Sequence, residues 1–179
     1  LVYQNIDLST VKNLLEVGCG VGAQSEILLR RFPELRLTGI DRNTKQLAAA
    51  KENLGKSPFS LNRFQFFEMD AGKMTFQNQS FDGAFLCWIL EHVPHPLQVL
   101  AEVKRVLNPG SIVYATEVMN SSFFLDPYSP NVWKYWMAFN EYQKNKKGDP
   151  FVGAKLGNFF LQLGYSDIRT EIKTWYLDN

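Results

Sequence analysis

The chain has few cysteines, almost no net charge and no long apolar run. Its 179 residues include two cysteines, Cys19 and Cys87, and their wide separation predicts reduced thiols in a cytoplasmic protein rather than a disulfide framework. A formal net charge of +1 gives no general attraction to nucleic acid or to an anionic membrane. No apolar segment approaches the ~20 residues that cross a bilayer, so we expect no membrane span.

Length and composition indicate one globular domain. Hydrophobic residues make up 45% of the chain and charged residues 21%, which is ordinary for a globular protein. A chain of 179 residues is long enough for one substantial core. It begins with Leu1 and shows no signal-peptide pattern and no internal repeat. We therefore expect residues 1–179 to form a single domain that is a fragment, or the ordered part, of a longer protein.

The first 118 residues alternate short apolar runs with helical segments. Residues 11–17, 35–40, 64–68, 81–87 and 112–118 are predicted as strands, and residues 24–32, 44–54 and 97–107 as helices. We expect Thr44 to cap the second helix, Pro96 to occupy the first position of the third, and residues 108–110 to form a turn. The alternation predicts a Rossmann-like α/β fold, with a mostly parallel sheet and helices on both faces.

The last third of the chain has a different pattern. Residues 132–144 and 152–163 are predicted as helices, the second ending at Gly164, and residues 167–177 as one long strand or two short ones. The aromatic residues of the first helix either roof a pocket or bury the helix against the sheet. They are Trp133, Tyr135, Trp136, Phe139 and Tyr142.

Three glycines follow the first predicted strand. Gly18, Gly20 and Gly22 allow the backbone to turn sharply and to approach a ligand closely. Residues 18–23 also fit the dinucleotide-binding pattern G-x-G-x-x-A. The loop therefore predicts a nucleoside-containing cofactor without choosing between cofactors.

Acidic residues stand at the ends of the first three strands. Glu16, Asp41 and Asp70 should face one crevice, because ligands bind beyond the carboxyl ends of the strands in an open α/β sheet. Three carboxylates would repel a pyrophosphate. They suit S-adenosylmethionine, which lacks phosphate and carries a positive sulfonium and an ammonium group. Asp41 is also placed to accept ribose hydroxyls, as in either class of cofactor.

Five runs of the sequence carry a family resemblance: LLEVGCGVGAQSEILL (14–29), LTGIDRN (37–43), FFEMDAGKMTF (66–76), FDGAFLCWILEHVPHP (81–96) and VLAEVKRVLNPGSIVYATE (99–117). Together they resemble the class I S-adenosylmethionine-dependent methyltransferases, and they are most similar to small-molecule enzymes such as the ubiquinone/menaquinone biosynthesis group. The resemblance implies a sheet of seven strands, the last antiparallel. We expect that final strand, and an N-terminal helix over the cofactor of which Tyr3 would be the stub, to be missing or disordered.

The resemblance implies a role for individual residues in holding the cofactor. Residues 1–118 would bind it, and residues 119–179 would form the acceptor side. The methionine part would contact Gly18, Cys19, Gly20 and Gly22, with its ammonium near Glu16 and its carboxylate near Gln24. Asp41 would hold the ribose, Arg42, Asp70 and Ala71 the adenine, and Cys87 and Trp88 would border the methyl group.

Some of these residues have simpler interpretations. Cys87 and Trp88 depart from the small or amide residues usual in the family, and Trp88 could be an ordinary packing residue. Cys19 is interpreted as a small apolar filler rather than a nucleophile.

Methyl transfer requires no dedicated acid, base or metal, because the sulfonium is already activated and the enzyme mainly aligns the acceptor. Where a base helps, His92 is the first candidate, ahead of Glu91 and His95; a capping or packing role for His92 is the alternative. The sequence lacks the N/D-P-P-Y/F run and the Pro-Cys pair of enzymes that methylate DNA or protein amides and pyrimidine carbon. We therefore expect a small-molecule acceptor and no nucleic acid.

Two other functions stay open at this point. A nicotinamide-dependent oxidoreductase would place a pyrophosphate on the glycine loop. A binding module would keep S-adenosylmethionine without transferring its methyl group, since catalysis here needs so few dedicated side chains.

Overall fold

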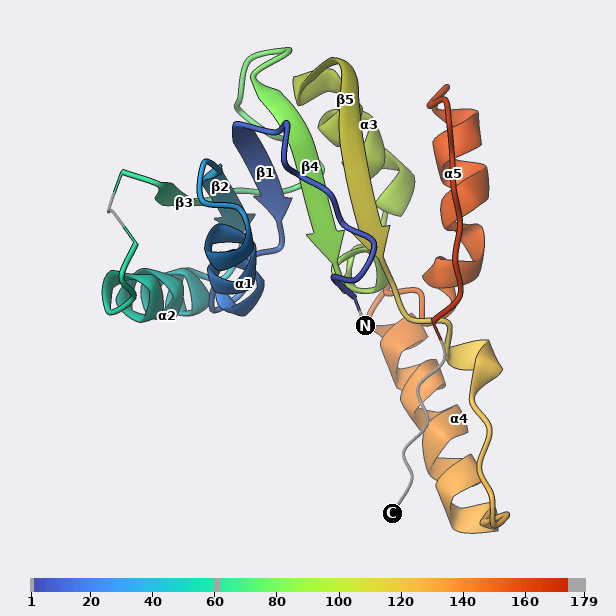
Figure 1. Ribbon diagram of the computed structural model, residues 1–179. Coiled ribbons are helices and arrows are strands. Elements are labelled where there is room, and N and C mark those ends of the chain that lie inside the picture. The colour runs from blue at the N-terminus through green and yellow to red at the C-terminus, as the bar shows by residue number, and fades with distance from the viewer. Residues whose placement is uncertain (1, 60–61, 174–179) are drawn as a thin grey trace.

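A five-stranded, all-parallel sheet forms the centre of the computed structural model, which describes residues 2–59 and 62–173 (Figure 1). Its strand order is β3-β2-β1-β4-β5, so the chain switches direction across the sheet beside the central strand β1. Ligands bind at this kind of switch point, beyond the carboxyl ends of the strands. The strands are β1 (Asn13–Val17), β2 (Arg36–Asp41), β3 (Phe64–Glu68), β4 (Phe81–Cys87) and β5 (Leu107–Thr116).

Helices cover both faces of the sheet, as the sequence predicts. One face packs against α1 (Ala23–Arg31) and α2 (Thr44–Gly55), and the other against α3 (Pro96–Val106) and α5 (Leu156–Gln162) (Figure 1). A longer helix, α4 (Pro130–Asn145), projects beyond the carboxyl ends of the strands. Three short 3₁₀ turns connect these elements: η1 (Leu90–His92), η2 (Asn120–Ser122) and η3 (Val152–Lys155).

Two hydrophobic clusters, one on each face, hold the layers together. Leu14 and Leu15 are consecutive in β1 and both fully buried, but they belong to opposite clusters because neighbouring strand residues point to opposite faces. The central strand is therefore covered on both sides, as parallel sheets require. Burial of Glu16 in the same strand, with 2% of its surface exposed, stands out against this apolar setting.

The helix ends agree with the sequence at Pro96, which begins α3. The predicted cap at Thr44 is wrong. Asn43 caps α2 instead, because its side-chain oxygen accepts hydrogen bonds from the Lys45 and Gln46 N–H groups at 3.0 and 3.2 Å. Residues 108–110 are an irregular part of β5 rather than a separate turn. The pairing register shifts there, and Gly110 has a φ of +80°.

The predicted helix 152–163 is broken into η3 and α5. The Gly153 N–H donates to the Val118 carbonyl at 3.1 Å, and a Cβ at Gly153 would lie 2.6 Å from that oxygen. Docking of the backbone against the segment after β5 therefore interrupts the helical run. Gly164, at a φ of +70°, follows the end of α5.

The strand predicted over residues 167–177 is wrong for residues 167–173, which form no strand, and the rest of it lies outside the described residues. The Tyr165 side chain donates to the Leu100 carbonyl at 3.2 Å, and Thr170 lies against Gly157 of α5. These contacts hold the segment beside the helices and away from the edge of β5. The described part of the sheet thus lacks an antiparallel strand.

The α4 helix and the segment leading into it form an arm, residues 119–150. The arm is joined to the body at Glu91: the Gln143 side chain donates to the Glu91 carboxylate at 2.7 Å, and the Asp149 N–H donates to the Glu91 carbonyl at 2.9 Å. Within the arm, Asn120 donates to Asn140 at 2.9 Å. Most other residues of α4 are exposed. No helix within residues 2–59 and 62–173 is long and apolar enough to cross a bilayer.

Candidate functional site

The glycine loop is fastened to the end of β2. The Gly18 and Cys19 N–H groups both donate to the Ile40 carbonyl, at 2.8 and 3.0 Å. Gly18, Gly20 and Gly22 all have positive φ angles, +74°, +54° and +80°, which L side chains rarely adopt. A Cβ at Gly18 would lie 2.9 Å from Ile89, so the loop packs directly on the segment that follows β4.

Asp41 links this loop to the next helix. Its Oδ2 accepts the Gly20 N–H at 2.9 Å, and its Oδ1 accepts the Asn43 N–H at 2.8 Å. Each carboxylate oxygen can accept a further hydrogen bond. The carboxylate is therefore held in a fixed orientation with acceptor capacity left for a ligand.

A cleft opens between the ends of β1, β2 and β3 and the segment after β4. Asp41 and Asp70 supply its carboxylates, and Asp70 is itself oriented by the Gly72 N–H, which donates to Oδ1 at 2.8 Å. The apolar walls suit a planar ring, and the two carboxylates suit polar groups on the edge of that ring and the hydroxyl groups of an attached diol. The cleft is lined by Gly18, Ile40, Asp41, Arg42, Met69, Asp70, Ala71, Ile89 and Val93.

The structure thus brings together five of the residues predicted for the cofactor: Gly18, Asp41, Arg42, Asp70 and Ala71. Sequence reasoning missed the apolar lining residues, Ile40, Met69, Ile89 and Val93. The signal was present at Ile40 and Met69, since each immediately precedes a predicted acid at a strand end. An aromatic ring needs apolar neighbours as well as polar ones.

Glu16 lies behind the loop and does not line the cleft. Its Oε2 accepts a hydrogen bond from the Ser25 hydroxyl of α1. Burial raises the pKa of Glu16 to about 8, and the Ser25 hydrogen bond opposes this only in part. Asp41 and Asp70 thus line the cleft, whereas Glu16 accepts from Ser25 of α1 and is not among the lining residues; its contact with the ammonium group of a cofactor stays a prediction.

Cys87 lies near Glu16, at the end of β4. Burial raises its pKa to about 12, the Glu117 and Glu16 carboxylates add to the rise, and a hydrogen bond with Gln24 opposes it. Burial likewise raises the pKa of Cys19. Neither thiol is therefore poised as a nucleophile. Tyr3 packs close to Cys87 and Glu16. Its ring stacks on Phe85 with 6.3 Å between centroids. Burial raises the pKa of Tyr3 to about 12, and Cys87 and Glu16 add to the rise.

Trp88 begins the segment that walls the cleft. It has a φ of +55°, in the region that favours glycine, and its side chain is 39% exposed. Its N–H donates to the Thr116 carbonyl at 3.0 Å. Trp88 and Cys87 are not among the residues that line the cleft, and their position beside the methyl group stays a prediction.

Glu117, just after β5, was not predicted as a site residue. Its Oε1 accepts the N–H groups of Ile89 and Leu90 at 2.9 and 2.7 Å. Burial raises its pKa to about 7. The sequence could have indicated Glu117 by its position, because it stands at the carboxyl end of the fifth strand as Asp41 stands at the end of the second.

His92 does not enter the cleft. Its side chain is 61% exposed, and its Nε2 lies 3.6 Å from Oε1 of Glu91. Glu91 is itself buried and accepts a hydrogen bond from Gln143 of α4. A role for His92 as a base stays a prediction.

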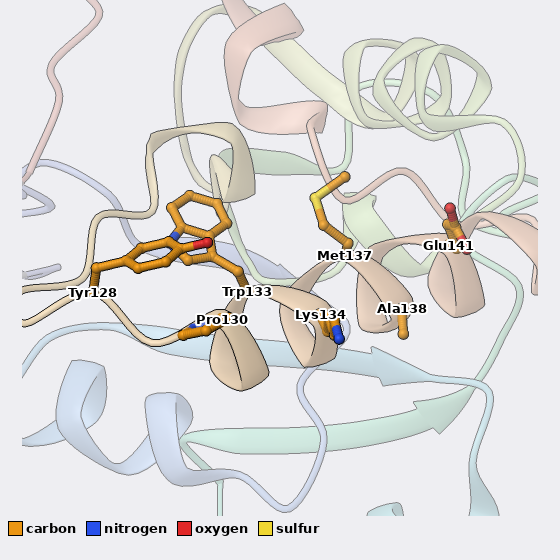
Figure 2. A pocket seen from close by; sticks show the side chains of 7 residues that line it. All are labelled: Tyr128, Pro130, Trp133, Lys134, Met137, Ala138 and Glu141. Atoms are coloured by element: carbon orange, nitrogen blue, oxygen red, sulfur yellow. The ribbon is translucent and has the colours of Figure 1, made fainter.

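The arm carries a second hollow of about 400 Å³ on α4. Figure 2 shows Tyr128 and Trp133 at one end and Glu141 at the other, with Met137 between them. Of the predicted aromatic group, Trp133 lines this hollow. Trp136 packs inward and donates to the Asn120 carbonyl at 3.1 Å. Tyr135 and Tyr142 are exposed.

The comparison with known families agrees with this geometry. A family model described as a methyltransferase domain matches residues 15–115, more than half of the chain. The chain therefore belongs to the class I S-adenosylmethionine-dependent methyltransferases. This membership confirms the resemblance seen in the sequence and favours a methyltransferase over a nicotinamide-dependent oxidoreductase.

Similar proteins include enzymes with different small acceptors. The chain is 27% identical to a demethylmenaquinone methyltransferase of Desulfitobacterium hafniense, over 77% of this chain and 53% of that protein. It is 31% identical to the O-methyltransferase cnsE of Penicillium expansum, over 90% of this chain and 56% of that protein. The chain thus spans about half the length of these curated relatives.

The fold agrees with a solved methyltransferase structure. Haemonchus contortus phosphoethanolamine N-methyltransferase 2, in complex with S-adenosyl-L-methionine, superposes with a TM-score of 0.66. The match covers 87% of this chain and 33% of that one, at 22% identity.

Proposed function

We propose that this chain transfers the methyl group of S-adenosylmethionine to a small-molecule acceptor. The observation that carries the proposal is Asp41, a carboxylate fixed by two backbone N–H groups at the mouth of an apolar cleft. That arrangement fits the adenosine part of the donor, and the absence of a Cβ at Gly18 lets the glycine loop pack directly on Ile89 of the cleft wall.

The residues divide the binding task among them. Asp41 accepts the ribose hydroxyls, and Asp70 accepts from the adenine amino group while Ile40, Met69 and Ala71 pack on the ring. The methionine part contacts the loop at Gly18, Cys19, Gly20 and Gly22, with Gln24 and Glu16 near its polar end. Arg42 lies beside the adenine. Cys87 and Trp88 border the methyl group.

The donor, when bound, supplies an already activated methyl group, so the chain needs to orient the acceptor and exclude water. The arm is the acceptor side of this proposal. Its hollow is lined mostly by apolar and aromatic side chains, with Lys134 and Glu141 at its rim, which suits an apolar or aromatic molecule bearing a nucleophilic atom. The named activities of the two relatives, on a demethylmenaquinone and on an oxygen atom, support this class of acceptor.

The proposal includes a single domain in which residues 1–118 bind the donor and residues 119–179 serve the acceptor. It also includes a cytoplasmic location and no nucleic-acid partner. The two free cysteines and the net charge of +1 support these last points.

Calorimetric titration with S-adenosylhomocysteine tests the donor site, with NADH as the comparison ligand. We expect binding of the first and no heat with the second; the reverse result refutes the proposal. A second step incubates the protein with methyl-labelled S-adenosylmethionine and fractionated cell metabolites. A labelled small molecule supports the acceptor class. Donor binding with no labelled product across the fractions favours a non-catalytic binding module.

A further inference from the structure

Glu117 connects the end of β5 to the wall of the cleft. One of its oxygens, Oε1, accepts two backbone hydrogen bonds from Ile89 and Leu90. Ile89 lines the cleft, and its side chain packs against Gly18 of the glycine loop. Glu117 therefore fixes the cleft wall from behind, without lining the cleft itself.

The wall segment needs such an anchor. Trp88 holds a positive φ, a conformation that a bulky side chain keeps only when surrounding contacts impose it. The contacts are the Trp88 N–H on the Thr116 carbonyl and the two N–H groups on Glu117. All three tie residues 88–90 to consecutive residues at the end of β5.

The other oxygen of Glu117 has no such partner. Oε2 is buried and makes no hydrogen bond within the part of the chain that the structure describes. Hydrogen bonds to one oxygen compensate burial only in part, so the pKa of Glu117 rises to about 7, with burial as the main cause. A proton taken up by Glu117 would sit on Oε2, because Oε1 already accepts two donors.

The groups that face Glu117 reinforce this behaviour. The Glu91 carboxylate of η1 raises the pKa of Glu117 further, the Glu91 backbone N–H opposes this rise in part, and the Cys87 thiol of β4 lies close enough for its own pKa to be raised by Glu117. From α4 the neutral Gln143 meets Glu91. No cationic side chain of residues 2–59 and 62–173 contributes to the shift of Glu117.

We propose that Glu117 is a positioning residue that holds the Trp88–Leu90 wall of the donor cleft, and that protonation of its unpartnered oxygen loosens the wall and weakens donor binding. The inference rests on the proposed function, in which this cleft holds S-adenosylmethionine. A neutral carboxyl is a weaker acceptor than a carboxylate. The wall is therefore firmest above the pKa of Glu117, and donor affinity falls as the pH drops through about 7.

Titration of the wild-type protein with S-adenosylhomocysteine at about pH 6 and pH 8.5 tests this. We expect binding at least about fivefold weaker at the lower pH. Glu117→Gln keeps an oxygen that accepts from Ile89 and Leu90 but cannot titrate. Its affinity should be close to the low-pH value of the wild type and should vary less than twofold with pH. A pH dependence that persists unchanged in Glu117→Gln overturns the inference, since it would then belong to another group such as Glu16.

Asp82→Asn is the matched control. Asp82 accepts the Asn13 N–H at 3.0 Å at the amino ends of β1 and β4, away from the cleft. This variant should therefore retain the full pH dependence. If Glu117→Gln does not fold, Glu117→Asp keeps the charge and should retain the pH dependence at reduced affinity.

A measurement without ligand separates this inference from the proposed function. The difference in tryptophan emission between wild type and Trp88→Phe should titrate with a midpoint near pH 7, and Glu117→Gln should abolish that titration. A wild type that binds no S-adenosylhomocysteine at any pH refutes the proposed function, while the emission titration still tests Glu117. Equal affinity at both pH values, or emission that does not titrate, refutes the role of Glu117 alone.

Discussion

Replacing Asp41 by asparagine tests the cleft at its most constrained residue. The carboxylate accepts the Gly20 and Asn43 N–H groups and, in the proposed complex, two ribose hydroxyls. A hydrogen bond to a charged group contributes roughly 1.5–3 kcal/mol, and one between neutral groups roughly 1 kcal/mol. The amide keeps one acceptor oxygen and turns the other into a donor. One ribose bond is therefore weakened and the other lost.

The expected loss is about 3 kcal/mol, which corresponds to roughly a hundredfold weaker binding of S-adenosylhomocysteine. The amide nitrogen also faces a backbone N–H, so Asp41→Asn should lower the free energy of unfolding by about 1–2 kcal/mol. Isothermal titration calorimetry measures the first effect and urea denaturation the second.

Asp82→Asn serves again as the control, because Asp82 also accepts a backbone N–H, together with the Asn108 side-chain amide at 3.0 Å. It should cost a similar amount of stability and leave the affinity unchanged. A folded Asp41→Asn protein that binds S-adenosylhomocysteine within threefold of the wild type would refute the reasoning, as would an equal loss of affinity in Asp82→Asn.

Three further predictions concern stability. Gly18→Ala should lower the free energy of unfolding by about 2–3 kcal/mol, because it adds backbone strain and places a Cβ 2.9 Å from Ile89 of the cleft wall. Gly110→Ala should lower it by only about 1 kcal/mol, because Gly110 has a φ of +80° but no neighbour within 4 Å. Equal losses of the two variants in urea denaturation would contradict this. The raised pKa of Glu16, about 8 against an ordinary 4.5, means that the folded chain binds more protons than the unfolded one between these values, so stability should fall with rising pH by up to ~1.4 kcal/mol per unit. Glu117, with a pKa raised to about 7, adds a slope of the same sign below that pH, so Glu16→Gln should remove the slope between pH 7 and pH 8 and only reduce it between pH 5 and pH 7. An unchanged slope would assign it to another group. Arg105→Ala should lower the free energy of unfolding by about 2–3 kcal/mol, because the Arg105 guanidinium donates to the carbonyls of residues 74 and 76 at 2.9 Å. Arg30→Ala removes only an exposed ion pair with Glu26 within a helix and should lower it by at most about 0.5 kcal/mol. Similar losses for the two variants would be inconsistent with this account.

The positions of the cleft residues were predictable because the sequence patterns that indicate them are local. A strand that ends in glycines or in an aspartate brings those residues to the carboxyl edge of the sheet, whatever the rest of the chain does. Asp41 and Asp70 were placed correctly on that ground. Position alone does not fix the direction of a side chain, however. Glu16 ends a strand in the same way, but the Ser25 hydroxyl draws it behind the loop.

Interactions between distant segments were not predictable. The hydrogen bonds that Ile89 and Leu90 donate to Glu117 join residues 28 and 27 positions apart, respectively. No periodic pattern in the sequence indicates them. Residues 167–173 were predicted as part of a strand, but in the folded chain Thr170 of this segment lies against Gly157 of α5, and the segment does not pair with β5 at the edge of the sheet. The break at Gly153 likewise depends on the Val118 carbonyl, which only the folded chain brings close.

The arm is joined to the body through its contacts with Glu91, and this has a consequence for how its sequence can vary. In the described part of the chain, the side-chain hydrogen bond between α4 and the body runs from Gln143 to Glu91, whereas the lining residues of the cleft all lie within residues 18–93. An exchange of the inserted segment 119–150 for another of similar length would leave every lining residue of the cleft in place. The cleft and the arm thus draw on separate stretches of the chain, so the sequence of the arm can be changed while every residue that lines the cleft is kept.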